Sequence, residues 1–167
     1  MPFLPMPRRI ETQRLVLTPE VASDAGWFTE LLDARGAGPA TEQDARDRIA
    51  AMAETIRTLG IGVLALRRRE DGAALGYCGL VVGRSSVDEP ELAYELLPSA
   101  QGAGYATEAA RAVLDAALAT GRTRIWATVR PGNAPSFRVL EKLGFRRHHD
   151  STDDAGGLVW LVWDVPG

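Results

Sequence analysis

Hydrophobic and polar positions along this chain follow two different periods, and these periods predict both helices and strands. The clearest helical pattern begins directly after a glycine-rich loop, where apolar residues recur every three or four positions. These apolar positions are Ala106, Ala109, Ala110, Val113, Leu114, Ala117 and Leu118. Gly121 is expected to end this helix, because glycine adopts the left-handed backbone conformation found just past a helix end.

The same spacing predicts further helices elsewhere in the chain. They are expected from Asp24 to about Leu32, from Thr41 to Gly60 and from Pro135 to Gly144. Asp24 is suited to cap the first of them through its carboxylate. Thr41, with Asp44 three residues later, is suited to cap the second. Each expected helix is therefore bounded by residues that stabilise helix ends.

Short apolar or alternating segments bounded by turn residues predict the strands. The expected strands are Arg14–Thr18, Gly62–Arg67, Ala74–Val82, Glu91–Leu97, Ile125–Val129, Phe145–His149 and Leu158–Val165, the last two joined by a loop at Asp150–Gly157. Two strands on either side of the long helix imply a parallel crossover, whereas the short turns imply antiparallel pairs. The chain is therefore expected to form one α+β domain over residues 1–167, with helices on both faces of a mixed, mostly antiparallel sheet.

Composition narrows the classes of function. The 167 residues are 46% hydrophobic and 25% charged, with a formal net charge of −3, which is typical of a globular domain. This charge argues against general affinity for nucleic acid or an anionic membrane. The basic run Arg67–Arg69 is expected to be a solvated strand end.

Cysteine and histidine content argues against a metal centre. Cys78 is the single cysteine, so neither an internal disulfide nor a cysteine metal cluster is expected. His148 and His149 are adjacent and should point to opposite faces of a strand, which leaves the chain without an expected metal site. Residues 1–9 contain three prolines and no apolar core of a signal peptide, so a cytoplasmic location is expected.

The segment Gln101–Ala106, between an apolar strand and the long helix, carries the clearest candidate chemistry. A loop at a helix N-terminus presents unpaired N–H groups together with the positive end of the helix dipole, an arrangement that binds anions. Gly102 and Gly104 let the backbone approach a phosphate, because neither has a Cβ. A phosphorylated ligand is therefore expected here.

Two phosphate-binding motifs are disfavoured by the surrounding sequence. The run from Gly102 resembles the start of a dinucleotide-binding G-x-G-x-x-G, but Thr107 occupies the third glycine position. The next strand ends at Arg130, where an acidic ribose-binding residue would be expected. A P-loop is also disfavoured, because no Gly-Lys-Ser/Thr follows the glycines. A nicotinamide enzyme therefore stays a minor alternative.

Four motifs, taken in order, resemble the GNAT N-acyltransferases, and in particular their Rim-type branch of ribosomal-protein N-terminal acetyltransferases and small-molecule relatives. The segments are Thr12–Leu17 (T-x-R-L-x-L), Glu91–Tyr94 (E-I-G-Y, with Ala93 in place of glycine), Gln101–Ala106 (Q/R-x-x-G-x-G/A) and Asn133–Phe145 (N-x-x-S…LGF). The resemblance extends over roughly Ile10–Val165. It implies a sheet with two splayed parallel strands and an acyl-CoA cleft between them.

The resemblance also implies how the donor binds. Acetyl-CoA would be the co-substrate, with its pyrophosphate on the N–H groups of the loop. Its pantetheine arm would lie between the strands expected at Glu91–Leu97 and Ile125–Val129. The residues implied in donor binding are Leu96, Leu97, Gln101, Gly102, Ala103, Gly104, Tyr105, Ala106 and Asn133.

Transfer from a thioester to an amine requires a proton acceptor, donors for the oxyanion and protonation of the leaving thiolate. Glu91 and Glu95 are the candidate bases, and Glu91 is preferred because it occupies the family position. The resemblance implies an oxyanion donor among the backbone N–H groups near Tyr94. Either carboxylate can instead be a solvent-facing strand residue.

Many relatives protonate the thiolate with a tyrosine, and the matching position here is Leu140, which cannot donate a proton. Ser136 matches the serine of the Rim-type motif and is the candidate proton donor, although it can equally be a helix residue with local hydrogen bonds. Asn133 is suited both to cap this helix at the Ser136 N–H and to hold the CoA arm.

The expected activity is N-acetyl transfer to a primary amine by direct attack in a ternary complex. The acceptor can be a small-molecule amine or a protein N-terminus, and the protein is expected to be a monomer or homodimer without nucleic-acid or membrane partners. The expected acceptor loops carry six acidic residues, either as an acidic rim or as solvated charge: Asp33, Asp88, Glu89, Asp150, Asp153 and Asp154. The alternative function is an acyl-CoA-binding sensor or partner module without catalysis.

Overall fold

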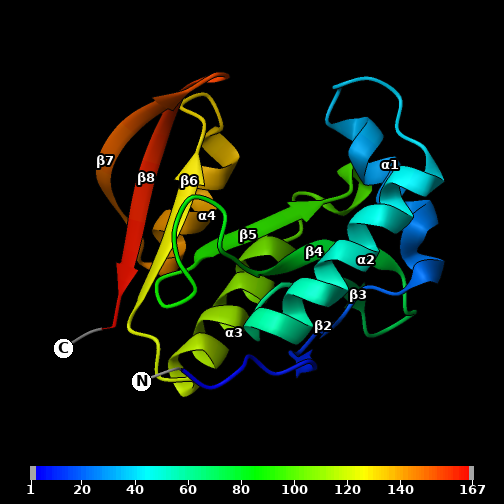
Figure 1. The fold of residues 1–167 in the computed structure, drawn as a ribbon, viewed down its shortest axis with the longest axis horizontal. Helices are drawn as coiled ribbons and strands as arrows, with labels where there is room; N and C mark the ends of the chain where they lie inside the picture. Colours follow the sequence, from blue (N-terminus) through cyan, green and yellow to red (C-terminus); the bar gives the residue numbers. More distant parts are fainter. Residues whose placement is uncertain (1–2, 166–167) are drawn as a thin grey trace.

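A computed structural model describes residues 3–165 of the chain. Strands and helices alternate irregularly along it (Figure 1). The elements are β1 (Ile10–Glu11), β2 (Leu15–Thr18), η1 (Ala22–Asp24), α1 (Ala25–Ala34), α2 (Glu42–Leu59), β3 (Val63–Arg68), β4 (Ala74–Val81), β5 (Glu91–Leu96), η2 (Pro98–Ala100), α3 (Tyr105–Ala119), β6 (Arg124–Val129), α4 (Ala134–Leu143), β7 (Arg146–Asp153) and β8 (Gly156–Asp164). The mixed α/β character expected from the sequence is confirmed.

Within residues 3–165 the strands form one sheet, in the order β1-β2-β3-β4-β5-β6-β8-β7. Neighbouring strands are antiparallel except β5 and β6, which run parallel on either side of the α3 crossover. Figure 1 shows β6, β7 and β8 as one wing of the sheet, from which β5 diverges. The mostly antiparallel sheet with one splayed parallel pair is therefore confirmed.

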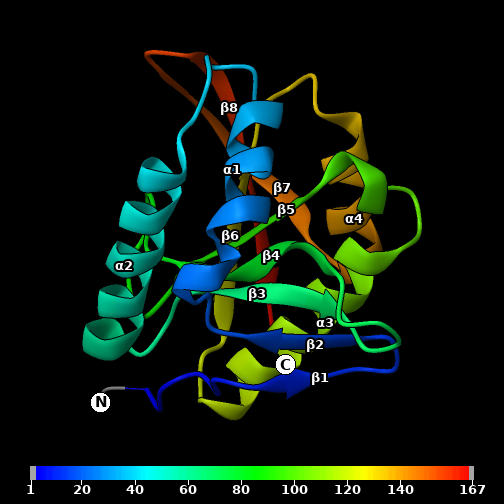
Figure 2. The same ribbon diagram turned by 90° about the vertical axis from the view of Figure 1, so that its right-hand side faces the viewer.

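Helices cover both faces of the sheet, as alternate residues of β4 demonstrate. Cys78 and Leu80 are fully buried in the main core against α3 residues such as Val113. Tyr77, which directly precedes Cys78, faces the other side of the sheet. It packs there against Phe28 of α1 and the cluster that α1 forms with α2. Figure 2 shows α2 and α4 on opposite sides of β5. Burial in the core raises the pKa of the Cys78 thiol to about 12, consistent with a packing role.

The predicted helix ends agree well with the structure. Thr41 accepts a hydrogen bond from the Asp44 N–H, and the Asp44 side chain in turn binds the Thr41 N–H, which forms the predicted capping box of α2. Gly60 and Gly144 end α2 and α4 in left-handed conformations. Most strand and helix boundaries fall within two residues of those expected.

The prediction that Asp24 caps the first helix through its carboxylate is wrong. Asp24 occupies the N-cap position of α1, but its carboxylate makes no capping bond to that helix. It is buried and instead accepts hydrogen bonds from the Val21 N–H, the Trp27 indole and Arg67. Arg67 is consequently held in a mostly buried ion pair, and the expectation of a solvated strand end is wrong for it.

The C-terminal hairpin is longer than expected. Residues 150–157 were predicted as a loop, but β7 and β8 pair as far as Asp153 and Gly156, with a tight turn between these two residues. Asp153 anchors this hairpin through ion pairs with Arg130 and Arg84. Within residues 3–165, no helix combines the length and the apolar character needed to cross a membrane.

Candidate active site

A gap between β5 and β6 forms the centre of the candidate site. Among the residues that the structure describes, these strands pair at a single register position, Glu91 with Trp126. The Trp126 N–H also donates to the Pro90 carbonyl at 2.9 Å. Beyond this point the strands separate, and the backbone edge of β5 is left without a strand partner. An extended ligand can therefore take the place of a strand there.

The alternation of backbone groups along β5 determines which of them face the gap. Leu97 donates its N–H to the carbonyl of Leu75 on the β4 side, at 2.8 Å. In an antiparallel pair, successive residues direct their backbone groups to opposite neighbours. The backbone groups of Tyr94 and Leu96 therefore face the gap, and the Leu96 carbonyl indeed accepts a hydrogen bond from the Gln101 side chain at 3.2 Å.

The glycine loop lies at the end of this gap and leads into α3. Gly102 and Gly104 have φ angles of 85° and 82°, in the left-handed region that other residues rarely adopt. The first bond of the helix runs from the Glu108 N–H to the Gly104 carbonyl. Among residues 3–165, no backbone or side-chain acceptor forms a hydrogen bond with the backbone N–H groups of residues 102–107. These unpaired donors at a helix N-terminus are suited to an anion, and the anion site itself stays a prediction.

The loop is held in place from the other end of the chain. Glu108, in the first turn of α3, accepts hydrogen bonds from the Thr12 hydroxyl at 2.5 Å and the Arg14 N–H at 2.9 Å. The Arg14 guanidinium pairs with Glu108 at 2.7 Å and also donates to the Ala103 carbonyl at 3.0 Å. It further stacks 4.4 Å above the centre of the Tyr105 ring. Burial opposes ionisation of Glu108, but these bonds outweigh it and hold the pKa of Glu108 below its ordinary value.

A cavity of about 310 Å³, which we call the donor cavity, brings most of the predicted site residues together. It is lined by Tyr94, Glu95, Leu96, Gln101, Gly102, Ala106, Asn133, Pro135, Ser136 and Val139. Tyr105 and Leu97, also predicted for donor binding, have buried side chains and do not line this cavity. Ala103 and Gly104 lie in the exposed loop beside this cavity. Segments far apart in the sequence thus converge on one volume.

Two hydroxyl groups meet at the wall of the donor cavity. The Tyr94 hydroxyl lies 2.8 Å from the Ser136 hydroxyl, and either oxygen can donate. The Asn133 side chain accepts the Ser136 N–H at 3.3 Å, so the predicted cap of α4 is confirmed. Burial raises the pKa of Tyr94, although the bond from Ser136 opposes the rise. The sequence indicated only a backbone role near Tyr94 and missed its hydroxyl.

Glu95 points to the opposite face of the sheet from the Tyr94 hydroxyl. Its carboxylate pairs with Arg35 at 2.9 Å and accepts a hydrogen bond from the Tyr77 hydroxyl at 3.2 Å. Burial, reinforced by the Glu95 charge, raises the pKa of Tyr77 to about 12, so Tyr77 stays protonated. Glu95 therefore belongs to the lining of the donor cavity as a residue, whereas its carboxylate lies on the other face of β5, beside Arg35 and Tyr77.

Glu91 occupies a different environment. It is only 4% exposed and does not line the donor cavity. Its carboxylate accepts the Thr128 hydroxyl of β6 at 2.8 Å and the backbone N–H of Arg84. These bonds connect the β4–β5 loop to β6 at the closed end of the gap. The geometry therefore suits Glu91 for holding the two strands together.

A second cavity, of about 380 Å³, lies between the sheet and helices α1 and α2, and we call it the acceptor cavity. Its polar lining residues include Glu20, Arg35, Arg48 and Tyr77, and Ala93 of β5 borders it. Sequence analysis missed these four polar residues. None belongs to a motif: Glu20 and Arg35 lie just beyond the ends of β2 and α1, whereas Arg48 and Tyr77 lie within α2 and β4.

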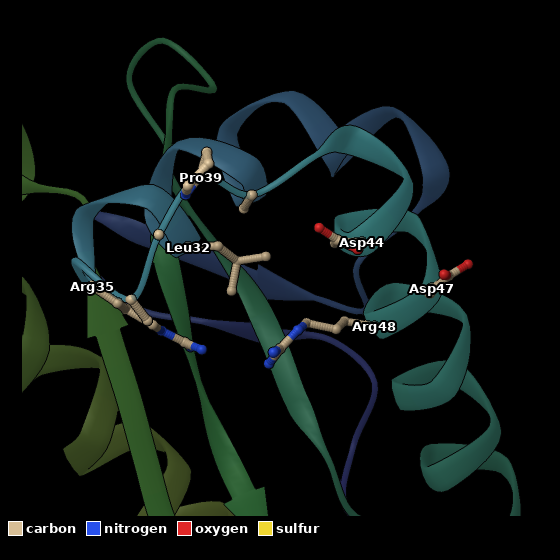
Figure 3. A pocket seen from close by; sticks show the side chains of 9 residues that line it. Leu32, Arg35, Pro39, Asp44, Asp47 and Arg48 are labelled. Carbon is tan, nitrogen blue, oxygen red and sulfur yellow. The ribbon is translucent and has the colours of Figure 1, made fainter.

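A third cavity, of about 400 Å³, lies under the α1–α2 loop. This cavity and the acceptor cavity are both bordered by Arg35 and Arg48. Figure 3 shows these two side chains pointing toward one another, whereas Asp47 points away. Asp33, expected in an acidic rim, instead accepts the Ala40 N–H at 2.6 Å and so shapes the loop.

The two histidines do not point to opposite faces, contrary to the prediction. A register shift between Arg147 and His149 adds a residue to β7, which is the pattern of a β-bulge. The two rings consequently lie on one side, with Nδ1 atoms 2.8 Å apart. Among the described residues, no group of three potential metal ligands comes together.

Comparison with known proteins gives one family match and several structural likenesses. The acetyltransferase (GNAT) domain family matches residues 14–146. The uncharacterized N-acetyltransferase YnaD of Bacillus subtilis (strain 168) is 43% identical over 58 residues, which are 34% of each chain. A structure described as a GnaT-family acetyltransferase from Bordetella pertussis is 29% identical, has a TM-score of 0.80, and is matched over 93% of this chain and 99% of its own.

A structure described as a ribosomal-protein-serine acetyltransferase from Vibrio cholerae shares the fold at a TM-score of 0.79. It is 18% identical, with 93% of this chain and 97% of its own covered. This likeness agrees with the Rim-type motifs at the level of fold. The chain spans about a third to a half of the length of the curated relatives that it matches.

Proposed function

The chain belongs to the acetyltransferase (GNAT) family, and we propose that it transfers an acetyl group from acetyl-CoA to a primary amine. The observation that carries this proposal is the gap between β5 and β6. Free N–H groups lie at one end of the gap, and paired hydroxyls line the cavity along it. The acceptor is a small-molecule amine or a protein N-terminus.

The free N–H groups of residues 102–107 would bind the pyrophosphate of acetyl-CoA, aided by the positive end of α3. The pantetheine arm would run along β5, where the backbone groups of Tyr94 and the N–H of Leu96 face the gap and are available for hydrogen bonds. Gln101 and Asn133 border the donor cavity and would contact the arm from either side. Binding along a strand edge orders the flexible arm and directs the thioester toward Tyr94.

The amine nitrogen would attack the thioester carbonyl carbon, so that a C–N bond forms and a tetrahedral intermediate results; its collapse would break the C–S bond and release the CoA thiolate. The backbone N–H of Tyr94, which faces the gap, would stabilise the oxyanion of the tetrahedral intermediate. The amine proton would pass through water to Glu95, whose side chain faces the acceptor cavity side of the sheet. The Arg35 and Tyr77 contacts would hold this carboxylate in place.

The leaving thiolate would receive its proton from the Ser136–Tyr94 hydroxyl pair. A serine hydroxyl alone is a weak acid, but the contact of 2.8 Å lets a proton pass between the two groups. The pair would then recover a proton from solvent. This pair stands in for the tyrosine that many relatives have at the position of Leu140, which is buried in the core here.

A thiol-release assay with a panel of primary amines tests this proposal, with mass spectrometry of the amine product. We expect thiol release that depends on the amine, together with a mass increase of one acetyl group. Tight acetyl-CoA binding without transfer to any amine would instead favour the sensor or partner module. Absence of acetyl-CoA binding would contradict the proposal altogether.

A further inference from the structure

Glu20 is a buried carboxyl group for which neither the fold nor the proposed transfer step has a use. The residue is 7% exposed and lines the acceptor cavity. Its Oε2 is shielded from solvent and has no hydrogen-bond partner among the described residues. An unpartnered buried carboxylate oxygen is costly, so such groups are normally paired or serve a ligand.

The charged neighbours of Glu20 do not neutralise it. Asp24 raises its pKa and Arg67 lowers it, but Arg67 is already bonded to Asp24. Two carboxyl groups therefore share one guanidinium. Of the other groups around the cavity, Arg35 is paired with Glu95, Arg48 is an exposed side chain at the rim, and Tyr77 stays protonated. Arg48 lines the same cavity but is not among the charges that shift the pKa of Glu20, so Glu20 has no cationic partner of its own among the described residues.

Strand register gives the distance between Glu20 and the reaction centre. Val63, Gly79 and Ala93 lie on one register row across β3, β4 and β5. With strands about 4.8 Å apart, Val63 and Ala93 are roughly 10 Å apart. Glu20 lies two residues beyond the end of β2. This strand pairs with β3 on the side away from β4 and β5. Glu20 and the thioester would thus lie toward opposite ends of the acceptor cavity, too far apart to share one nitrogen.

We infer that Glu20 binds a second, positively charged group of the acceptor, and that the acceptor is therefore a small diamine. This inference rests on the proposed function, because it assumes that the reacting amine lies near Ala93. One nitrogen would be acetylated there, while the other, protonated nitrogen would pair with Glu20. The volume of about 380 Å³ suits a small molecule of this kind.

The state of Glu20 makes this recognition depend on pH. Burial, followed by the Asp24 charge, raises the pKa of Glu20 to about 7 in the protein without acceptor. A cation pairs with the ionised form only. The preference for a diamine is therefore expected at pH 8 and should fade as the pH falls through 7 and Glu20 becomes protonated.

Calorimetry with the CoA-saturated protein tests the inference without requiring turnover. The probes are 1,5-diaminopentane and the matched monoamine pentylamine. A charge-assisted hydrogen bond corresponds to roughly 10- to 100-fold in affinity, so the diamine should bind more tightly by this factor at pH 8. Glu20→Gln should remove the advantage, whereas Glu70→Gln, at an exposed turn, should keep it.

Equal affinity for the two amines in the parent protein would overturn the inference. An advantage that survives Glu20→Gln would overturn it as well, because a purely structural role for Glu20 predicts a change in stability but none in this ratio. CoA affinity, measured in the same titrations, separates the two proposals. Loss of CoA binding would refute the proposed function, whereas CoA binding without diamine preference would refute the assignment to Glu20 alone.

Discussion

The donor and acceptor sides of the sheet are built in different ways. The donor side uses mainly backbone groups, namely the N–H groups of the glycine loop and the free edge of β5. The acceptor side uses isolated side chains, with Glu20, Arg35 and Tyr77 coming from three separate segments. Backbone groups are present in every sequence, so only their exposure must be encoded, whereas each side-chain site must be encoded residue by residue.

This difference has a consequence for how each side tolerates change. A donor site made of backbone N–H groups depends on loop conformation, so it is sensitive to residues that set φ or hold the loop. An acceptor site made of side chains depends on the identity of single residues. Substitutions on the two sides should therefore affect different measurements, and four of them test this separation.

The largest effect is expected for Glu95→Gln, which removes the proposed proton acceptor. We expect kcat to fall by about 10³-fold, within the usual range for a general base, while acetyl-CoA affinity stays unchanged. Steady-state kinetics and calorimetry measure the two quantities. Glu91→Gln is the matched comparison: it should lower the free energy of unfolding, because Glu91 joins the β4–β5 loop to β6. A larger loss of kcat in Glu91→Gln would reverse these roles.

The second largest effect is expected on the acceptor side, where Glu20→Gln should change the free energy of unfolding. The pKa of Glu20 in the folded protein is about 7, above its ordinary value of 4.5, so between these values the folded state binds more protons than the unfolded state. The contribution of Glu20 to stability is therefore present at low pH and lost as the pH rises to 7. At pH 8, Glu20→Gln should stabilise the protein by roughly 3 kcal/mol.

Urea unfolding of the parent and Glu20→Gln at pH 5 and pH 8 measures this effect. The gain should be large at pH 8 and small at pH 5. A gain that does not change with pH would mean that the carboxyl group ionises normally in the folded protein, and it would remove the pH dependence expected for diamine binding.

A smaller effect is expected on the donor side for Ser136→Ala. Removal of this hydroxyl leaves Tyr94 without its partner in the proton pathway to the thiolate, and kcat should fall by about 10²-fold. Tyr94→Phe should produce a similar loss if the two hydroxyls act as a pair, and the double variant should lose little more than either single variant. Unchanged turnover in Ser136→Ala would exclude the Ser136 hydroxyl from the mechanism.

The smallest effect is expected for Thr12→Val, which cuts one bond between the N-terminal segment and Glu108. We expect a loss of about 1 kcal/mol in the free energy of unfolding. Acetyl-CoA affinity should fall a few-fold, because Glu108 holds the first turn of α3, whose N-terminus is proposed to bind the pyrophosphate, while diamine affinity should not change. A comparable loss of diamine affinity would mean that the two sides are mechanically coupled.

Local patterns in the sequence predicted the fold and the conformation of the glycine loop well, for a physical reason. Helix periodicity, capping pairs such as Thr41 with Asp44, and the two loop glycines act over a few residues, so their effect is visible in the sequence. The acceptor side could not be predicted in this way. Glu20, Arg35 and Tyr77 meet only because strand pairing and helix packing bring distant segments together.

The errors have the same origin. Asp24 makes no capping bond and instead forms a buried ion pair with Arg67, a partner 43 residues away. The bulge that turns His148 and His149 to one side depends on pairing with β8, and nothing in the local sequence marks it. Which of Glu91 and Glu95 accepts the proton stays a prediction: both side chains project to the same face of β5, and the two residues differ in their position along the strand.

Calorimetry of acetyl-CoA binding to the parent protein and to Gly104→Pro tests the central claim most directly. Proline fixes φ near −65° and removes an N–H, whereas residue 104 requires a φ of 82°. The account predicts micromolar binding by the parent and a loss of at least about 100-fold in the variant, with the fold retained by circular dichroism. Absence of binding by the parent protein would contradict the donor site and the transfer mechanism built on it.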